Sequence, residues 1–172
     1  LYSISIGLFE INSHDKSKNF EYLEGEITLG VVHAPALNET YWAGKGKGAF
    51  LNGKKIKVSK EKNLANSLMV TGLPYENRNI NLPYFIKMMD HCQAIRRLGS
   101  AALDMCYLAA GRFDGYWEFG LKPWDIAAGS LIVKEAGGKV TDINGNLLDL
   151  FGYDIMASNG KIHPQILRTF SE

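Results

Sequence analysis

The 172-residue sequence predicts a fold of the α/β class, in which an antiparallel, β-rich first third joins a region of alternating strands and helices. Through about residue 60, apolar and polar side chains alternate with the period of two that is typical of half-buried strands. From about Asn63 onward, short apolar runs alternate with segments of helical spacing. With 46% hydrophobic and 22% charged residues, the composition is that of an ordinary globular protein, which excludes intrinsic disorder.

The first third is predicted to consist of short strands joined by turns. Because residues 1–11 alternate, we expect one face of that strand to lie against a core. A polar turn is expected at 12–19, and Asn52-Gly53 favours the type I′ turn of a hairpin. The strands are expected at residues 1–11, 26–33, 40–43, 49–51 and 55–58.

The chain begins at Leu1 in the middle of an alternating run, so we expect another segment to precede it. The apolar residues of this run, Tyr2, Ile4, Ile6 and Leu8, would then face a surface that the preceding segment covers. Exposed strand edges and apolar patches favour association, so the chain alone is expected to aggregate or to be only marginally stable.

The remainder of the chain is predicted to alternate strands and helices. Gly111 and Gly137-Gly138 are expected to end two of the helices. Strands are expected at 67–71, 94–98, 114–119, 139–142 and 155–158, and helices at 83–93, 101–110, 125–136 and 163–170. We divide the chain into two domains at the change of pattern, residues 1–62 and residues 63–172.

Charge and cysteine content narrow the function classes. Lys and Arg total 19 against 18 Asp and Glu, so the chain has no global electrostatic reason to bind nucleic acid or an anionic membrane. Its apolar stretches are too short to span a bilayer. Cys92 and Cys106 do not form a disulfide scaffold, which favours a reduced, cytoplasmic setting, and Cys106 lies on an apolar helix face that we expect in the core.

Three stretches contain polar residues of the types that bind metal ions, phosphates or substrate hydroxyls. Asp125 lies at the start of a predicted helix, where free N–H groups and the helix dipole hold a carboxylate. Taken alone, such an aspartate is more often a helix cap than a metal ligand, because a metal site needs partner carboxylates.

The other two stretches are also ambiguous when each is taken alone. Gly99-Ser100 opens a predicted helix, so the first N–H groups of that helix can hold a phosphate or hydroxyl oxygen, although ordinary capping is the alternative. Glu118 ends an aromatic strand seven residues before Asp125. In isolation it is expected to be a surface residue or the partner of an arginine.

Together these stretches resemble the inositol monophosphatase family of Mg²⁺-dependent, lithium-sensitive phosphatases. Residues 124–138 (WDIAAGSLIVKEAGG) are similar to the C-terminal signature of that family, and residues 96–118 to the segment before it. Residues 44–53 (GKGKGAFLNG) are similar to its GKGAF-NG region. The resemblance covers the whole chain and implies an α/β/α/β/α sandwich in which residues 1–62 supply the remaining strands of the first sheet.

The resemblance also implies roles for individual residues. Asp125 corresponds to an aspartate that helps to hold the second Mg²⁺, and Glu118 to a glutamate that accepts a hydrogen bond from a substrate hydroxyl. The substrate-binding residues that it implies are Gly99, Ser100, Ala101, Glu118 and Arg96, with Arg97 as the alternative to Arg96 for a second phosphate.

Two metal-binding segments of the family, a Gly-Glu-Glu stretch and an Asp-Pro-x-Asp-Gly-Thr stretch, do not occur in these 172 residues. We therefore identify no catalytic residue and expect the chain alone to be inactive. For the complete protein, the resemblance implies a cytoplasmic, homodimeric phosphoric monoester hydrolase that uses Mg²⁺ on a small inositol or sugar phosphate. Two alternatives stay open, a fructose-1,6-bisphosphatase of the same fold and a non-catalytic fragment or binding module.

Overall fold

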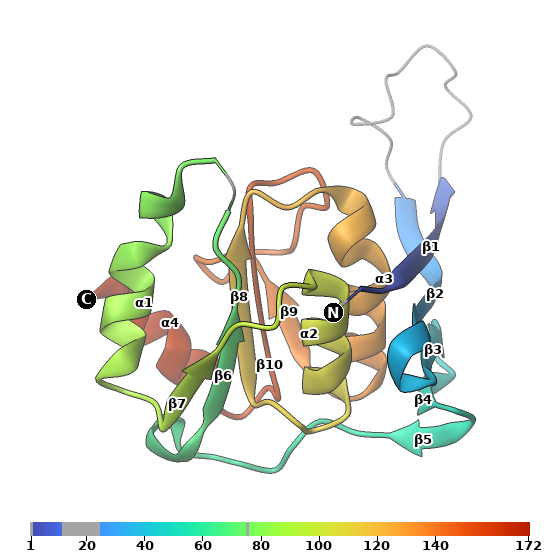
Figure 1. The fold of residues 1–172 in the computed structure, drawn as a ribbon, viewed down its shortest axis with the longest axis horizontal. Helices are drawn as coiled ribbons and strands as arrows, with labels where there is room; N and C mark the ends of the chain where they lie inside the picture. Colours follow the sequence, from blue (N-terminus) through green and yellow to red (C-terminus); the bar gives the residue numbers. More distant parts are fainter. Residues whose placement is uncertain (1, 12–24, 75) are drawn as a thin grey trace.

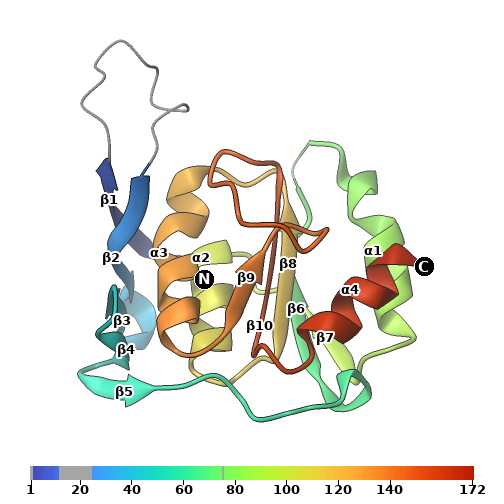
Figure 2. The ribbon, with the colours of Figure 1, turned by 180° about the vertical axis from the view of Figure 1, so that it is seen from behind.

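A computed structural model of the chain describes residues 2–11, 25–74 and 76–172, so the turn expected at 12–19 lies outside the described residues. The described elements stack in four layers, with sheet A on one outside, two helices between sheets A and B, and two helices on the far face of sheet B (Figure 1). The view from behind shows the same order (Figure 2). These are four of the five layers that the resemblance implies, since no described helix covers the outer face of sheet A.

Sheet A is the antiparallel sheet that the first third predicts. Its strands lie side by side in sequence order: β1 (Ile4–Ile11), β2 (Gly25–Ala34), β3 (Glu39–Gly44), β4 (Gly48–Leu51) and β5 (Lys54–Ile56). Between β4 and β5, Asn52 and Gly53 have φ angles of 48° and 79°. Positive φ at both positions is what a type I′ turn requires, so the predicted hairpin is confirmed.

Sheet B is mixed, with the strand order β7-β6-β8-β10-β9. Its strands are β6 (Leu68–Thr71), β7 (Ala94–Arg96), β8 (Gly115–Phe119), β9 (Lys139–Thr141) and β10 (Asp154–Ser158). Strand β6 runs parallel to both β7 and β8, whereas β10 runs antiparallel to β8 and to β9. The carboxyl ends of β6, β7 and β8 therefore lie at the same edge of the sheet.

The helices follow the prediction closely, with one clear difference. They are α1 (Leu82–Met89), α2 (Ala101–Ala109), α3 (Pro123–Glu135) and α4 (His163–Ser171), and short 3-10 turns lie at Pro35–Leu37, Leu64–Asn66 and Arg78–Ile80. The helix expected at 83–93 ends at Met89. It ends early because the chain turns toward β7, where the Gln93 N–H donates to the Ser67 carbonyl over 3.1 Å.

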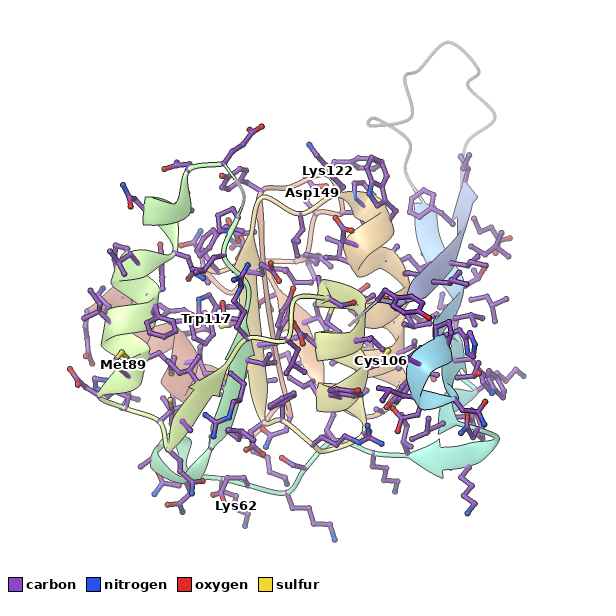
Figure 3. All side chains as sticks on the ribbon, in the orientation of Figure 1. Lys62, Met89, Cys106, Trp117, Lys122 and Asp149 are labelled. Carbon is purple, nitrogen blue, oxygen red and sulfur yellow. The ribbon has the colours of Figure 1, made fainter. Side chains whose placement is uncertain are left out.

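Two apolar clusters fill the space between the layers. The larger lies between sheet A, α2, α3 and one face of sheet B, and it includes Cys106 at 0% exposure, which confirms the core position expected for that cysteine. The smaller lies between the other face of sheet B and the pair α1 and α4, and it includes Trp117. Figure 3 shows Cys106 on α2 toward sheet A and Trp117 on the side of β8 that faces α1 and α4.

Small residues let α3 lie close against sheet A. A Cβ atom on Gly30 of β2 would come within 3.0 Å of the Ala128 Cα, and one on Gly7 of β1 within 3.0 Å of the Ala127 Cβ. Because no side chain is present at either glycine, the first turns of α3 approach the backbone of the sheet directly. This close packing fixes the start of α3 relative to β1.

The strand at residues 4–11 meets the core with its small residues. Gly7 faces α3, whereas Ile4, Ile6 and Leu8 are between 55% and 62% exposed. The expectation that one face of this strand lies against a core therefore holds for the face with small side chains, and the apolar face points outward. Among the described residues, no helix is long and apolar enough to cross a membrane.

Candidate functional site

A cavity of about 610 Å³ opens at the edge of sheet B where the parallel strands β6, β7 and β8 end. In open α/β sheets this edge is where loops bring binding residues together. The cavity is lined by residues from the start of β1, the segment after β6, the start of α2 and the turn that leads from β8 into α3. Five residues selected from the sequence line it: Gly99, Ser100, Ala101, Glu118 and Asp125.

The start of α2 presents backbone N–H groups to the cavity. Gly99 has a φ of 88°, a conformation that favours glycine, and it turns the chain from β7 into the helix. Ser100 is the extended N-cap residue, but its side chain makes no capping bond and instead lies 3.1 Å from the Ser3 hydroxyl of the β1 segment. The first N–H groups of α2, at Ala101 and Ala102, lie at the positive end of the helix and suit an anionic or hydroxyl oxygen.

Glu118 is buried at 9% exposure, so the interpretation of this residue in isolation as a surface group is wrong. The Tyr116 hydroxyl donates to its Oε2 over 2.9 Å and so orients the carboxylate. Burial is the main reason why the pKa of Glu118 is raised to about 7; the Tyr116 hydrogen bond and the Arg97 charge oppose this shift, and the Asp125 charge adds to it. The site thus holds a carboxylate that is partly desolvated and ready to accept a hydrogen bond.

Asp125 lies in the first turn of α3 and is half-buried. Its Oδ2 accepts the Lys122 N–H over 2.9 Å, which completes a capping arrangement at the start of the helix. The capping role and a position on the cavity wall therefore coexist at this residue. Figure 3 shows Lys122 at the edge of the molecule where α3 begins.

These residues do not form a complete metal site by themselves. Among the described residues, no group of three or more His, Cys, Asp or Glu side chains is arranged to hold a metal ion. Mg²⁺ prefers several oxygen ligands in octahedral geometry, whereas Asp125 offers one carboxylate with one oxygen already accepting a backbone N–H. Asp125 fits the role of a single ligand only.

The structure separates the two neighbouring arginines. Arg96 ends β7, is exposed, and its Nη1 donates to the carbonyl of Ile95 over 3.0 Å. Arg97 lines the cavity. The residue of this pair that lines the cavity is therefore Arg97, the alternative, and not Arg96.

The sequence did not reveal a second buried acid beside Glu118. Asp104 on α2 is 1% exposed, and neither carboxylate oxygen has a hydrogen-bond partner. Burial, and to a lesser extent the Glu118 charge, raises its pKa to about 8. The sequence signal that could have revealed Asp104 was the presence of an aspartate in an otherwise apolar helix, four residues after Ser100.

Two more cavity residues lie outside the motifs that the sequence offered. The Ser5 hydroxyl oxygen, from β1, is buried without a hydrogen-bond partner. Gly72 follows β6 and contacts Glu118 closely, which only the pairing of β6 with β8 could reveal.

Comparison with known proteins places these features in a family. The model of the inositol monophosphatase family matches residues 2–172. A relative from Thermotoga maritima, named fructose-1,6-bisphosphatase/inositol-1-monophosphatase, is 44% identical over 157 residues, which cover 91% of this chain and 60% of the relative. A Pasteurella multocida relative named Nus factor SuhB is 43% identical over 149 residues, which cover 84% of this chain and 55% of the relative.

Solved structures show the same fold. The structure of inositol monophosphatase from Anabaena superimposes with a TM-score of 0.83 at 40% identity, covering 87% of this chain and 60% of that one. The chain thus spans between 55% and 60% of the length of the two curated relatives.

Proposed function

Because the chain belongs to the inositol monophosphatase family, we propose that it forms the substrate-recognition part of a Mg²⁺-dependent phosphatase. The reaction would be hydrolysis of a small inositol or sugar phosphate to the alcohol and phosphate. The observation that carries the proposal is the cavity of about 610 Å³ that brings Glu118, Asp125 and the start of α2 together. Residues far apart in the sequence meet there with complementary chemistry.

Each part of the cavity has a distinct task in this proposal. The first N–H groups of α2 hold an oxygen of the substrate, because they lie uncapped at the positive helix end. Glu118, oriented by the Tyr116 hydroxyl, accepts a hydrogen bond from a hydroxyl of the sugar or inositol ring. These contacts orient the substrate and add specificity, since a buried charged acceptor rejects a ligand that lacks the hydroxyl.

Asp125 is proposed as one ligand of a Mg²⁺ site whose other ligands lie outside the described residues. Bound Mg²⁺ supplies Lewis-acid chemistry to phosphoryl transfer. The family resemblance also leads us to propose a cytoplasmic homodimer, which light scattering on the purified protein tests for its oligomeric state.

Phosphate release from inositol 1-phosphate tests the proposal. We expect none from the 172-residue chain and Mg²⁺-dependent release from a protein of family length that contains it. In that longer protein, Asp125→Asn is expected to lower kcat by about two orders of magnitude or more, because a metal ligand loses its charge. The matched control is Asp90→Asn, at the far end of α1, which is expected to keep normal kcat. Near-normal kcat for Asp125→Asn would leave that residue as a helix cap only.

Substrate discrimination tests the role of Glu118. Glu118→Gln in the longer protein is expected to reduce the preference for inositol 1-phosphate over ring-free glycerol 2-phosphate by about 1–3 kcal/mol, the cost of a lost charged hydrogen bond. Equal losses on both esters would contradict a contact with the ring. The Tyr116→Phe variant is a useful companion, because it removes the hydroxyl that orients Glu118 while preserving the ring.

A second candidate substrate is fructose 1,6-bisphosphate. This substrate is favoured by Arg97, which lines the cavity, because a guanidinium can pair with a second phosphate. Arg97→Ala is expected to raise KM for the bisphosphate about tenfold or more and to leave KM for inositol 1-phosphate nearly unchanged. Arg96→Ala is the matched control, since its side chain lies outside the cavity wall.

A non-catalytic role is the remaining alternative. One relative carries the name Nus factor, and the described residues hold no complete metal site. A longer protein that binds inositol 1-phosphate but releases no phosphate with Mg²⁺ would favour this alternative over the phosphatase.

A further inference from the structure

The segment that follows β6, residues 72–74, lines the cavity although it lies outside the motifs on which the proposed function rests. It begins where β6 stops pairing with β8, since Thr71 is opposite Trp117 and the next residue of β8 is Glu118. Gly72 is therefore placed directly beside the carboxylate that is proposed to recognise the substrate.

Gly72 has no room for a side chain. A Cβ atom there would overlap Oε1, Cδ and Oε2 of Glu118. Gly72 is buried, and its φ lies outside the left-handed region, so the backbone conformation itself does not require glycine. The requirement is for space, and the group that occupies this space is the Glu118 carboxylate.

A buried amide fixes Gly72 relative to β8. Asn81, which precedes α1, is 0% exposed, and its Nδ2 donates to the Gly72 carbonyl over 2.6 Å and to the Thr71 hydroxyl over 3.0 Å. Its Oδ1 accepts the Trp117 Nε1–H over 2.6 Å. Because Trp117 and Glu118 are neighbours on β8, this amide links the wall on one side of the carboxylate to the strand that carries it.

The Glu118 carboxylate is thus enclosed by groups with defined positions. The Tyr116 hydroxyl holds Oε2 at 2.9 Å, and the bare Cα of Gly72 lies against the carboxylate. Any side chain at position 72 would push the carboxylate away from β6 and change how far it reaches into the cavity. The depth available to a substrate ring would change with it.

We propose that Gly72 is a specificity-determining position, because its lack of a side chain sets the depth at which Glu118 accepts a ring hydroxyl, and that Asn81 is the positioning residue that holds Gly72 in place. This inference rests on the proposed function. Within that function, it concerns how the cavity distinguishes the phosphate of a cyclic polyol from an open-chain phosphate.

The contact between Gly72 and Glu118 can be tested by unfolding of the protein of family length, without any catalytic assay. Gly72→Ala is expected to lower the urea midpoint of unfolding by roughly 1 M, because an extra methyl group is forced into a packed site. In a Glu118→Ala background the same substitution is expected to cost little. An undiminished cost in that background would overturn the inference. Gly44→Ala is the control, since a Cβ there would meet no atom closer than 3.4 Å.

Specificity is tested in the protein of family length with inositol 1-phosphate and ring-free glycerol 2-phosphate. Gly72→Ala is expected to raise KM for inositol 1-phosphate roughly tenfold, with kcat within about twofold, and to leave KM for glycerol 2-phosphate nearly unchanged, because only the ring needs the depth that Glu118 defines. Asn81→Ser is expected to change the same ratio in the same direction, by a smaller factor. Equal effects on both esters would show that Asn81 is only structural.

The outcomes separate this inference from the function on which it rests. If the wild-type protein hydrolyses both esters and Gly72→Ala preserves the ratio of their KM values, the inference is overturned and the phosphatase stands. If the wild-type protein hydrolyses neither ester, the proposed function fails and the inference that rests on it fails with it.

Discussion

Buried polar groups are hydrogen-bonded to one another near one end of strand β8, whereas several buried polar groups near the other end have no hydrogen-bond partner. At its first residue, Gly115, β8 pairs with Ser158 of β10, whose hydroxyl lies 2.9 Å from Nδ1 of His163. The other ring nitrogen, Nε2, lies 3.1 Å from the Thr141 hydroxyl. All three residues are at most 4% exposed, so this end holds a compact and mutually paired polar network.

At its other end, β8 carries Glu118 into the cavity, and the polar groups around it are less completely paired. The two oxygens of Asp104 and the hydroxyl oxygen of Ser5 are buried without hydrogen-bond partners. Native proteins pair the great majority of such groups, because an unpaired buried polar group costs about 1–3 kcal/mol. Ser5 lines the cavity, and Asp104, although it does not line the cavity, lies close enough to Glu118 for the Glu118 charge to raise its pKa. The unpaired groups therefore lie toward the end of β8 where the candidate site is, whereas the paired end of β8 serves the fold.

The largest effect that can test this comparison is at Asp104. Its folded-state pKa of about 8 exceeds the value of about 3.9 in an unfolded chain, so its contribution to stability is fully present below pH 4 and is lost as pH rises through 8. Asp104→Asn removes this loss and is expected to stabilise the chain by up to about 5 kcal/mol at pH 9 relative to wild type. Urea unfolding at pH 5, 7 and 9 measures the difference.

The same substitution at a paired carboxylate supplies the control. Asp114 accepts the Leu68 N–H on Oδ2 over 2.7 Å and also accepts from the Ser59 hydroxyl, so Asp114→Asn is expected to destabilise the chain at every pH. A loss of stability for Asp104→Asn at pH 9 would mean that the Asp104 carboxylate is well paired after all.

The next effect is at the paired end, and it has the opposite sign with pH. Burial lowers the pKa of His163 to about 4, below the value of about 6.5 in an unfolded chain. Its contribution to stability is therefore present above pH 6.5 and is lost as pH falls through 4, by about 3 kcal/mol in total. Unfolding at pH 4 to 7 should show this loss in wild type and in His91→Gln, an exposed control, but much less of it in His163→Gln.

The sequence predicted most of the fold because periodicity and glycine positions act locally. The Asn52-Gly53 turn and the ends of α2 and α3 follow from backbone preferences that a few neighbouring residues decide. The sequence also led us to expect that Ile4, Ile6 and Leu8 of the strand at residues 4–11 point away from the core of this chain, but the close approach of α3 to the other face of this strand could not be predicted in this way. Its apolar face points outward because the approach of α3 requires small residues such as Gly7 on the inner face.

The site residues that lie in recognisable motifs could be predicted from the sequence. The contacts that depend on which strands pair could not. Glu118, Asp125 and the start of α2 were selected because their motifs resemble those of the inositol monophosphatase family, and all three line the cavity. Choosing between Arg96 and Arg97 needed the register of β7, and the contact between Gly72 and Glu118 needed the parallel pairing of β6 with β8. Neither pairing leaves a local mark in the sequence, since the partners are more than twenty residues apart.

The smallest expected effect comes from the most direct comparison, in which a serine hydroxyl is removed from each of the two regions. Ser158→Ala takes a hydroxyl from His163 Nδ1 and from the Gly160 N–H, and it is expected to destabilise the chain by about 1–2 kcal/mol. Ser5→Ala removes a buried hydroxyl oxygen that has no partner, so the free energy of unfolding is expected not to fall and to rise by up to about 1 kcal/mol. Equal losses in urea unfolding would end the contrast between the two regions. A Ser5→Ala variant that is no less stable than wild type but binds inositol 1-phosphate more weakly in the longer protein would show that this hydroxyl serves the ligand and not the fold.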